Sequence, residues 1–255
     1  MRLQNKLCVI TGAGSGIGEA AGHLFAREGA QVVLLEIDEA SGTRVAAEIG
    51  APATFIATDV SNPDSVAAAF QEIHKQFGRL DGLYNNASVF WGKHDAAVTE
   101  LDLDIYHRIV AINQHSVVYC AKHAIPMMIN SGGGAVVNTA SSAAVIGVPG
   151  SDAYTASKGA TLSLTRSLAV EYGPKKVRTN CVAPAAIATP MVRESNLDDP
   201  NFDEQAFLDK TPVRRWGQPE EVAQVAMFLI SDESAYVNGA IVVADGGITI
   251  TPIAV

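Results

Sequence analysis

Short apolar runs and longer mixed stretches alternate along the whole chain. Seven runs rich in β-branched and other apolar residues predict buried strands. They lie near residues 6–11, 31–36, 53–58, 80–85, 134–139, 176–182 and 240–244. Because most intervals between them have the length of a helix, we expect an α/β fold with a mostly parallel, doubly wound, seven-stranded sheet and helices on both faces. No linker divides the chain, which predicts a single domain over residues 1–255.

A glycine-rich turn follows the first predicted strand. The sequence Gly12-Ala13-Gly14-Ser15-Gly16-Ile17-Gly18 leads into a helical stretch from about residue 19 to 28. Between a strand and a helix, glycines allow a tight turn and let backbone N–H groups approach a pyrophosphate, whose charge the helix N-terminus favours. The turn therefore predicts a dinucleotide site and a Rossmann-type fold.

An acidic residue ends the second predicted strand. Glu36 follows the glycine motif by about 20 residues, the spacing of an acid that bonds the adenosine ribose hydroxyls and repels a 2′-phosphate. Neither Ser15 nor Ile37 carries a positive charge that would attract such a phosphate. The pattern favours NAD over NADP as cofactor. The alternative is that Asp38, rather than Glu36, faces the ribose.

Tyr154, Lys158 and Ser141 are the candidate reacting groups. Tyr154 and Lys158 stand four residues apart, so on a helix they share one face, and Ser141 lies thirteen residues upstream of Tyr154. A free tyrosine has a pKa of about 10. We expect the nearby ammonium to lower the phenol pKa, so that the phenol can give a proton to a ketone or take one from an alcohol. Ser142 is the alternative to Ser141 as the hydroxyl that holds the substrate oxygen.

Together with further motifs, these residues resemble the short-chain dehydrogenase/reductase family in its compact single-domain branch. The added motifs are Asp59-Val60 after the third strand, Asn85-Asn86-Ala87 after the fourth, and the segment 184–189. The resemblance covers essentially the whole chain. It implies a catalytic tetrad of Asn113, Ser141, Tyr154 and Lys158, with Asn113 in a locally distorted helix and holding a water. It also implies NAD contacts at Gly12, Ser15, Gly16, Ile17, Gly18, Glu36, Asp59, Val60, Asn86, Ala87, Tyr154, Lys158, Pro184, Ile187 and Thr189.

Two positions depart from the family pattern. Ser88 and Ala185 stand where the family has glycine. If the backbone at Ser88 needs a positive φ, serine costs on the order of 1 kcal/mol there. A methyl group at Ala185 would narrow the space beside the nicotinamide.

Three segments are candidates for the substrate side of the site. Residues 185–217, the least regular stretch, follow the sixth strand and are expected to form a substrate lid, with a passive surface insertion as the alternative. Phe90 and Trp91 either line the pocket or form a packed loop. The apolar residues 145–150, between Ser141 and Tyr154, suggest a substrate with an apolar or weakly polar body.

Composition agrees with a soluble metabolic enzyme. The net charge of −9 disfavours nucleic-acid partners, and no apolar run approaches the roughly 20 residues of a membrane span. Without a signal peptide, and with three cysteines that we expect to be reduced, a cytoplasmic location is predicted. The histidines show no metal-ligand spacing, so no metal site is expected. These histidines are His94, His107, His115 and His123.

The resemblance also implies subunit contacts. In the family, the helices corresponding to about residues 101–129 and 154–172 pair between subunits, which predicts a homotetramer or a dimer. The apolar tail 246–255 would bury itself at such a contact. The leading functional hypothesis is an NAD-dependent alcohol dehydrogenase or ketone reductase. The alternatives are an NADPH-dependent reductase of 3-oxoacyl-carrier thioesters and a nucleotide-binding protein without turnover.

Overall fold

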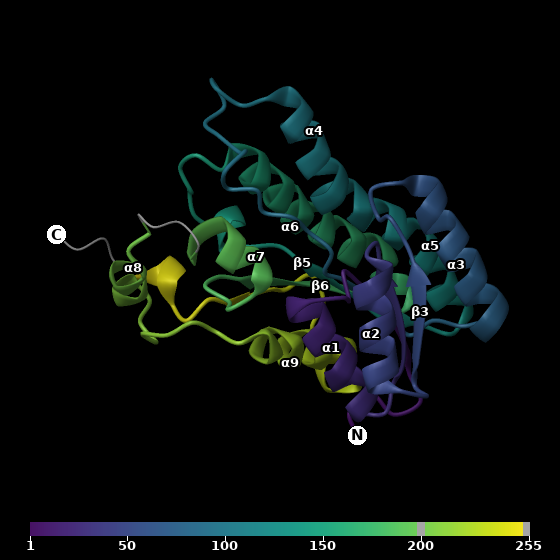
Figure 1. Ribbon diagram of the computed structural model, residues 1–255. Helices are drawn as coiled ribbons and strands as arrows, with labels where there is room; N and C mark the ends of the chain where they lie inside the picture. Colours follow the sequence, from purple (N-terminus) through teal and green to yellow (C-terminus); the bar gives the residue numbers. More distant parts are fainter. Residues whose placement is uncertain (198–201, 252–255) are drawn as a thin grey trace.

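A single parallel sheet of seven strands forms the centre of the computed structural model, which describes residues 1–197 and 202–251 (Figure 1). The strands are β1 (Leu7–Thr11), β2 (Gln31–Glu36), β3 (Ala53–Ala57), β4 (Gly82–Asn85), β5 (Gly134–Thr139), β6 (Val177–Pro184) and β7 (Ile241–Ala244). Their order in space is β3-β2-β1-β4-β5-β6-β7, and every neighbouring pair is parallel. The predicted α/β fold with a doubly wound sheet is confirmed.

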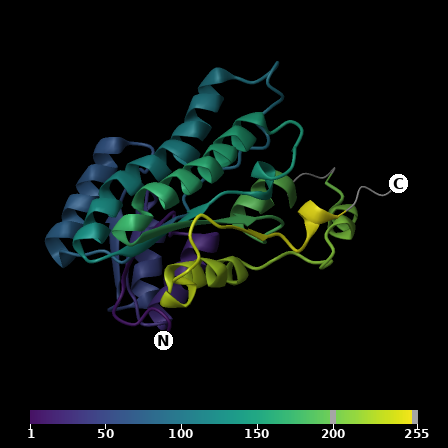
Figure 2. The same cartoon turned by 180° about the vertical axis from the view of Figure 1, so that it is seen from behind.

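Helices cover both faces of this sheet. The longer ones are α1 (Gly16–Arg27), α2 (Glu39–Ile49), α3 (Pro63–Phe77), α4 (Leu103–Val110), α5 (Ser116–Asn130), α6 (Asp152–Tyr172), α8 (Glu204–Lys210) and α9 (Pro219–Ile230). Shorter turns are η1 (Ala111–His115), η2 (Ser142–Ala144), η3 (Gly173–Lys175), α7 (Pro190–Val192), η4 (Arg193–Leu197), η5 (Asp232–Ser234) and η6 (Ile248–Ile250). One apolar core joins α1, α2 and α9 to the sheet, and a second joins α3, α5 and α6 to its other face (Figure 2).

The predicted boundaries hold for the strands and shift for some helices. All seven strands lie within three residues of their predicted ends. The first helix begins at Gly16 rather than near residue 19, because Gly16 and Gly18 are already helical. The helix expected over about 101–129 is divided into α4, the π-helical η1 and α5. That residues 1–255 form one domain remains a prediction.

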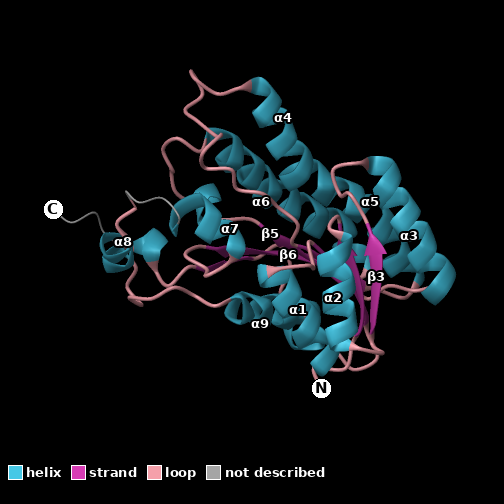
Figure 3. Cartoon of the chain, in the orientation of Figure 1, coloured by secondary structure: helices cyan, strands magenta, loops and turns pink. Residues whose placement is uncertain are grey.

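The strand order reverses between β1 and β4, and this reversal positions the site. In a parallel sheet, a crevice opens outside the carboxyl ends of the strands at such a point. The glycine turn follows β1 at this point, and Asn86 follows β4. Helices lie above and below the sheet (Figure 3). Among the described residues, none of the helices is both long and apolar enough to cross a membrane.

Candidate active site

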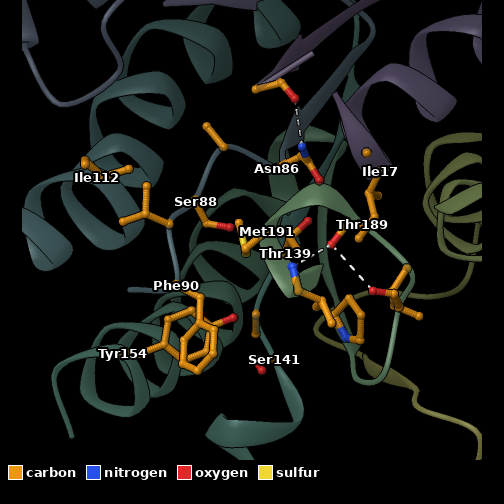
Figure 4. A pocket seen from close by; sticks show the side chains of 18 of the residues that line it. Ile17, Asn86, Ser88, Phe90, Ile112, Thr139, Ser141, Tyr154, Thr189 and Met191 are labelled. Carbon is orange, nitrogen blue, oxygen red and sulfur yellow. Dashed lines mark hydrogen bonds between the residues drawn. The ribbon is translucent and has the colours of Figure 1, made fainter. Parts of the chain in front are cut away.

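A cleft of about 780 Å³ runs along the carboxyl ends of the strands (Figure 4). Most residues expected to contact cofactor or substrate line it. These are Gly12, Ser15, Gly16, Ile17, Glu36, Asp59, Val60, Asn86, Ala87, Ser141, Tyr154, Pro184, Ile187 and Thr189. Gly18, Asn113 and Lys158 are not part of the lining, but each contacts a residue that is, namely Gly12, Val89 and Thr139 in turn. The volume is within the usual range for a ligand pocket, roughly 300–1,000 Å³.

The glycine turn is packed too closely for larger residues. Gly12 has a φ of +63°, and a Cβ there would lie 2.8 Å from the Cα of Ala87. A Cβ on Gly18 would lie 2.0 Å from the carbonyl oxygen of Gly12, which explains why Gly18 supports the turn and does not line the cleft. Asn86 completes the turn by donating its side-chain amide to the carbonyls of Thr11 and Gly12, at 3.1 and 3.2 Å.

Of the two acids considered for the ribose, Glu36 faces the cleft. Its Oε2 accepts a hydrogen bond from the Gly14 amide at 2.9 Å, and its Oε1 accepts from the Ile37 amide at 2.8 Å. Asp38 instead caps α2 by accepting from the Ser41 amide at 2.7 Å. Glu36 therefore joins the end of β2 to the glycine turn, where an adenosine ribose would lie.

Tyr154 and Lys158 face one another on α6, but their ionisation differs from the expectation. The Lys158 Nζ lies 5.7 Å from the centre of the Tyr154 ring and donates to the Thr139 carbonyl at 3.0 Å. Burial raises the pKa of Tyr154, opposed by a hydrogen bond with Ser141. Burial also lowers the pKa of Lys158 to about 8. The expected lowering of the phenol pKa by Lys158 is wrong for these side chains, because exclusion of water disfavours the charged form of both groups.

Asn113 lies in the π-helical turn η1, so the expected distortion of its helix is confirmed. Its Oδ1 accepts from the Val89 amide at 2.8 Å, and its Nδ2 donates to the Val89 carbonyl at 2.9 Å. The same Nδ2 donates to Ser157 at 3.3 Å, and the Ser157 hydroxyl donates to the Tyr154 carbonyl at 2.7 Å. Asn113 thus connects the loop after β4 to the helix that carries Tyr154.

Ser141 and the groups beside it fit a sugar-bearing ligand. The Ser141 oxygen accepts from the Ala143 amide at 3.2 Å, and its hydroxyl also meets the Tyr154 phenol. The buried Thr139 hydroxyl, on the cleft wall, has no partner among the described residues. In that part of the chain the Lys158 ammonium, which carries three N–H donors, makes a single hydrogen bond. The spare N–H donors of Lys158 suit the diol of a ribose, and the glycine turn at the N-terminus of α1 suits the phosphates of a nicotinamide dinucleotide.

The two departures from the family pattern cause no backbone strain of their own. Neither Ser88 nor Ala185 has a positive φ, so the cost expected at Ser88 does not arise. The residue next to Ala185, Ala186, does have a positive φ, of +54°. Its carbonyl accepts from the Gly217 amide at 2.8 Å, since the chain turns sharply here to pair with the segment before α9. The sequence offered no signal for this position.

The substrate end of the cleft is mostly apolar. The Phe90 ring meets Tyr154 edge-on, with 4.9 Å between ring centres. Figure 4 labels both side chains in the cleft. Trp91 lies outside the lining and packs beneath the Arg108 guanidinium, 4.9 Å from its ring centre. Other apolar side chains lining this end are Ile146, Val148, Met191, Phe207 and Trp216. Phe90 thus belongs to the pocket and Trp91 to its support.

The segment expected to form a lid is only partly described. Met191 and Trp216 line the cleft, and the Trp216 indole stacks on Phe207 at 5.1 Å between ring centres. Ser195 donates to the Phe90 carbonyl at 2.8 Å. Residues 198–201 of the expected lid, and residues 252–255 of the tail, lie outside the described residues.

One group of potential metal ligands occurs in the described part of the chain, away from the cleft. Glu19, His23 and Glu48 bring their ligand atoms within 4.8 Å of one another. The Arg44 guanidinium binds both carboxylates, at 2.7 Å from Glu19 and 3.0 Å from Glu48, so the group is an ion-pair cluster.

Comparison with known proteins decides the family. A family model described as enoyl-(acyl carrier protein) reductase matches residues 12–249. The chain belongs to the short-chain dehydrogenase/reductase family. Cyclohexanol dehydrogenase of Acinetobacter sp. (strain SE19) is 36% identical over 251 residues, which cover 97% of this chain and 96% of that protein.

Two solved structures of the family superpose closely. Levodione reductase has a TM-score of 0.93 at 33% identity, covering 98% of this chain and all of that one. The 3-ketoacyl-(acyl-carrier-protein) reductase from Brucella melitensis complexed with NADH has a TM-score of 0.89 at 33% identity, covering 97% of this chain and 99% of that one. This short-chain dehydrogenase/reductase is therefore an oxidoreductase that binds a nicotinamide cofactor.

Proposed function

We propose that the protein is an NAD-dependent oxidoreductase that interconverts a secondary alcohol and its ketone. The observation that carries this proposal is that Ser141 and Tyr154 line the same cleft into which the glycine turn opens, with Lys158 directly behind. A bound nicotinamide ring supplies the hydride acceptor or donor. Ser141 donates a hydrogen bond to the substrate oxygen. Tyr154 takes the hydroxyl proton in oxidation and returns it in reduction.

Lys158 and Asn113 support this chemistry from behind the wall. The free N–H donors of Lys158 bind the nicotinamide ribose. Asn113, in the π-helical turn, positions a water that passes protons to solvent. The remaining contacts to NAD come from the cleft residues around the glycine turn, from Asp59 and Val60 at the adenine, and from Pro184, Ile187 and Thr189 at the carboxamide.

The preference for NAD rests on Glu36. Its carboxylate is held at the cleft by three backbone amides, those of Gly14, Ile37 and Asp38. A ribose diol can donate to such a carboxylate, whereas a 2′-phosphate would be repelled by it. The competing function is an NADPH-dependent 3-oxoacyl-carrier reductase. Comparing kcat/KM for NADH and NADPH separates the two, since a clear preference for NADPH would overturn our proposal.

The substrate body is proposed to be apolar and compact. Phe90, Ile146, Val148 and Met191 line the same cleft as Tyr154 and carry no charge, and Arg108 is the one basic residue among the described residues of the lining. The similarity to a cyclohexanol dehydrogenase agrees with an alicyclic alcohol. A panel of neutral cyclic and open-chain secondary alcohols, assayed with NAD, tests this. Strong turnover of a multiply charged substrate, with none of the neutral ones, would contradict it.

Tyr154→Phe tests the central role directly. Removal of one hydroxyl leaves the ring and its packing on Phe90 in place. We expect turnover to fall by at least about 100-fold, the usual contribution of a general acid–base group, while NAD binding measured by calorimetry persists. An unchanged rate would refute the mechanism. If the wild type binds NAD but turns over no alcohol or ketone, the protein is a nucleotide-binding protein instead.

A homotetramer or dimer is also proposed. Val118 on α5 and Val170 on α6 are exposed apolar residues, and Val170 is 80% exposed. Burial of these side chains against another subunit would remove apolar surface from water. We also propose that residues 185–217 close over the substrate as a lid. Light scattering that shows a monomer at micromolar concentration would overturn the assembly.

A further inference from the structure

The first turn of α6, which carries Tyr154, is capped by a residue far away in the sequence. Ser151 occupies the N-cap position but makes no side-chain capping bond. Asp95 supplies the missing acceptors. Its Oδ1 accepts from the Ala153 amide at 3.1 Å, and its Oδ2 accepts from the Tyr154 amide at 2.8 Å. The first turn therefore depends on a carboxylate that is 58 residues away from Ala153 along the chain.

This carboxylate is buried and fully engaged. Asp95 is 7% exposed, and its Oδ1 also accepts from the Ala96 amide at 2.9 Å. A reciprocal bond lies next to it, where Asp152 Oδ2 accepts from the Val98 amide at 2.8 Å. The loop after β4 and the start of α6 are thus tied together by hydrogen bonds in both directions.

Such a cap matters because Tyr154 sits at the end of a helix. The first four amides of a helix have no partner within it, so an uncapped first turn frays. A carboxylate also interacts favourably with the positive end of the helix dipole. Since a displacement of about 1 Å at a reacting group can cost about 100-fold in rate, fraying of this turn would move the phenol out of position.

The loop that carries Asp95 also contacts the side chain of Tyr154. Phe90, five residues before Asp95, packs its ring edge-on against Tyr154, and its carbonyl accepts from Ser195. The loop therefore holds Tyr154 at two points, at its backbone amide through Asp95 and at its ring through Phe90.

We propose that Asp95 is a positioning residue for the reaction, which holds the Tyr154 phenol in place by capping α6 from the loop after β4. This inference rests on the proposed role of Tyr154. The capping itself predicts a local effect that is independent of turnover.

Asp95→Ala removes all three accepted hydrogen bonds. At a temperature where the variant is folded, we expect kcat for alcohol oxidation to fall about 10- to 100-fold, because the phenol is no longer held. KM for the alcohol and the Kd for NAD should change by less than about threefold, since Ser141 and the glycine turn are untouched. Asp95→Asn keeps the shape and one acceptor oxygen, so its kcat should lie between those of wild type and Asp95→Ala.

Asn62→Ala is the matched control. Asn62 caps α3 by accepting from the amides of Asp64 and Ser65, at 2.9 and 3.3 Å, and α3 carries none of the proposed reacting groups. Loss of this cap should lower the melting temperature and leave kcat within about twofold of wild type. If Asn62→Ala loses as much kcat as Asp95→Ala, general destabilisation explains both and our inference is wrong.

Hydrogen exchange separates a failure of this inference from a failure of the proposed function. Amides in residues 152–158 should exchange at least about tenfold faster in Asp95→Ala than in wild type, whatever the enzyme turns over. Unchanged exchange, or a kcat within twofold of wild type in Asp95→Ala, overturns the role of Asp95 alone. Should Asp95→Ala fail to fold, the same two measurements on Asp95→Asn decide. Absence of any turnover in wild type counts against the proposed function, and the exchange result then still tests the cap.

Discussion

Replacement of Lys158 by methionine should remove a stability penalty that the wild type carries below about pH 8, and the size of this penalty follows from burial. Lys158 is 1% exposed, and its pKa falls from an ordinary value of 10.5 to about 8. At 1.36 kcal/mol for each pKa unit, this difference means that the folded state holds the ammonium at a cost of about 3 kcal/mol near neutral pH. The hydrogen bond to the Thr139 carbonyl offsets part of that cost.

The sign of the pH dependence is fixed by which state binds more protons. Between the folded value of about 8 and the unfolded value near 10.5, the unfolded chain keeps its proton and the folded chain releases it. The free energy of unfolding contributed by Lys158 therefore rises with pH in this window. From about pH 7 to pH 9.5, wild type should gain about 2 kcal/mol relative to Lys158→Met. Titratable groups that do not interact with Lys158 titrate alike in both proteins and cancel in the difference.

Urea unfolding followed by circular dichroism measures this difference. Both proteins are compared at about pH 7 and about pH 9.5, at one protein concentration because an oligomer gains stability by mass action. Lys75→Met is the matched control, since the Lys75 side chain is 79% exposed and has no burial cost to relieve. A stability difference between wild type and Lys158→Met that is the same at both pH values would refute the reasoning. Lys158→Met should also lose most alcohol oxidation even where it is as stable as wild type.

Three further outcomes are expected. Ala186→Gly should raise the melting temperature by about 1–3 °C. Glycine adopts a positive φ without strain, and this gain should exceed the loss from the larger conformational entropy of glycine in the unfolded chain. No rise in the melting temperature would mean that no strain is stored at Ala186. Glu36→Ala should lower kcat/KM for NAD by about tenfold and improve NADP relative to NAD, as judged by steady-state kinetics; an unchanged ratio would remove Glu36 from cofactor selection. Alcohol oxidation should accelerate from about pH 7 to pH 9.5, because burial raises the pKa of Tyr154 and the phenolate forms only in base, so a falling rate would contradict its role as the base.

Local patterns along the chain were enough for the architecture and for the main residues of the cleft. The alternation of apolar runs and helical stretches depends on each segment alone, so all seven strands could be predicted from their own residues. The glycine turn could be predicted from local backbone geometry, since Gly12 adopts a positive φ that other residues avoid. The spacing of Tyr154 and Lys158 places both on one face of a helix whatever surrounds it.

Only the packed chain decided how these groups ionise and what holds them. The sequence pointed to Lys158 as the group that acidifies Tyr154, but exclusion of water penalises both charges, and burial is a property of the whole fold. The carboxylate of Asp95 reaches α6 across 58 residues, and the strain at Ala186 arises from pairing with a distant segment. Such contacts join parts of the chain with no local relation, so no periodicity or motif along the sequence could reveal them.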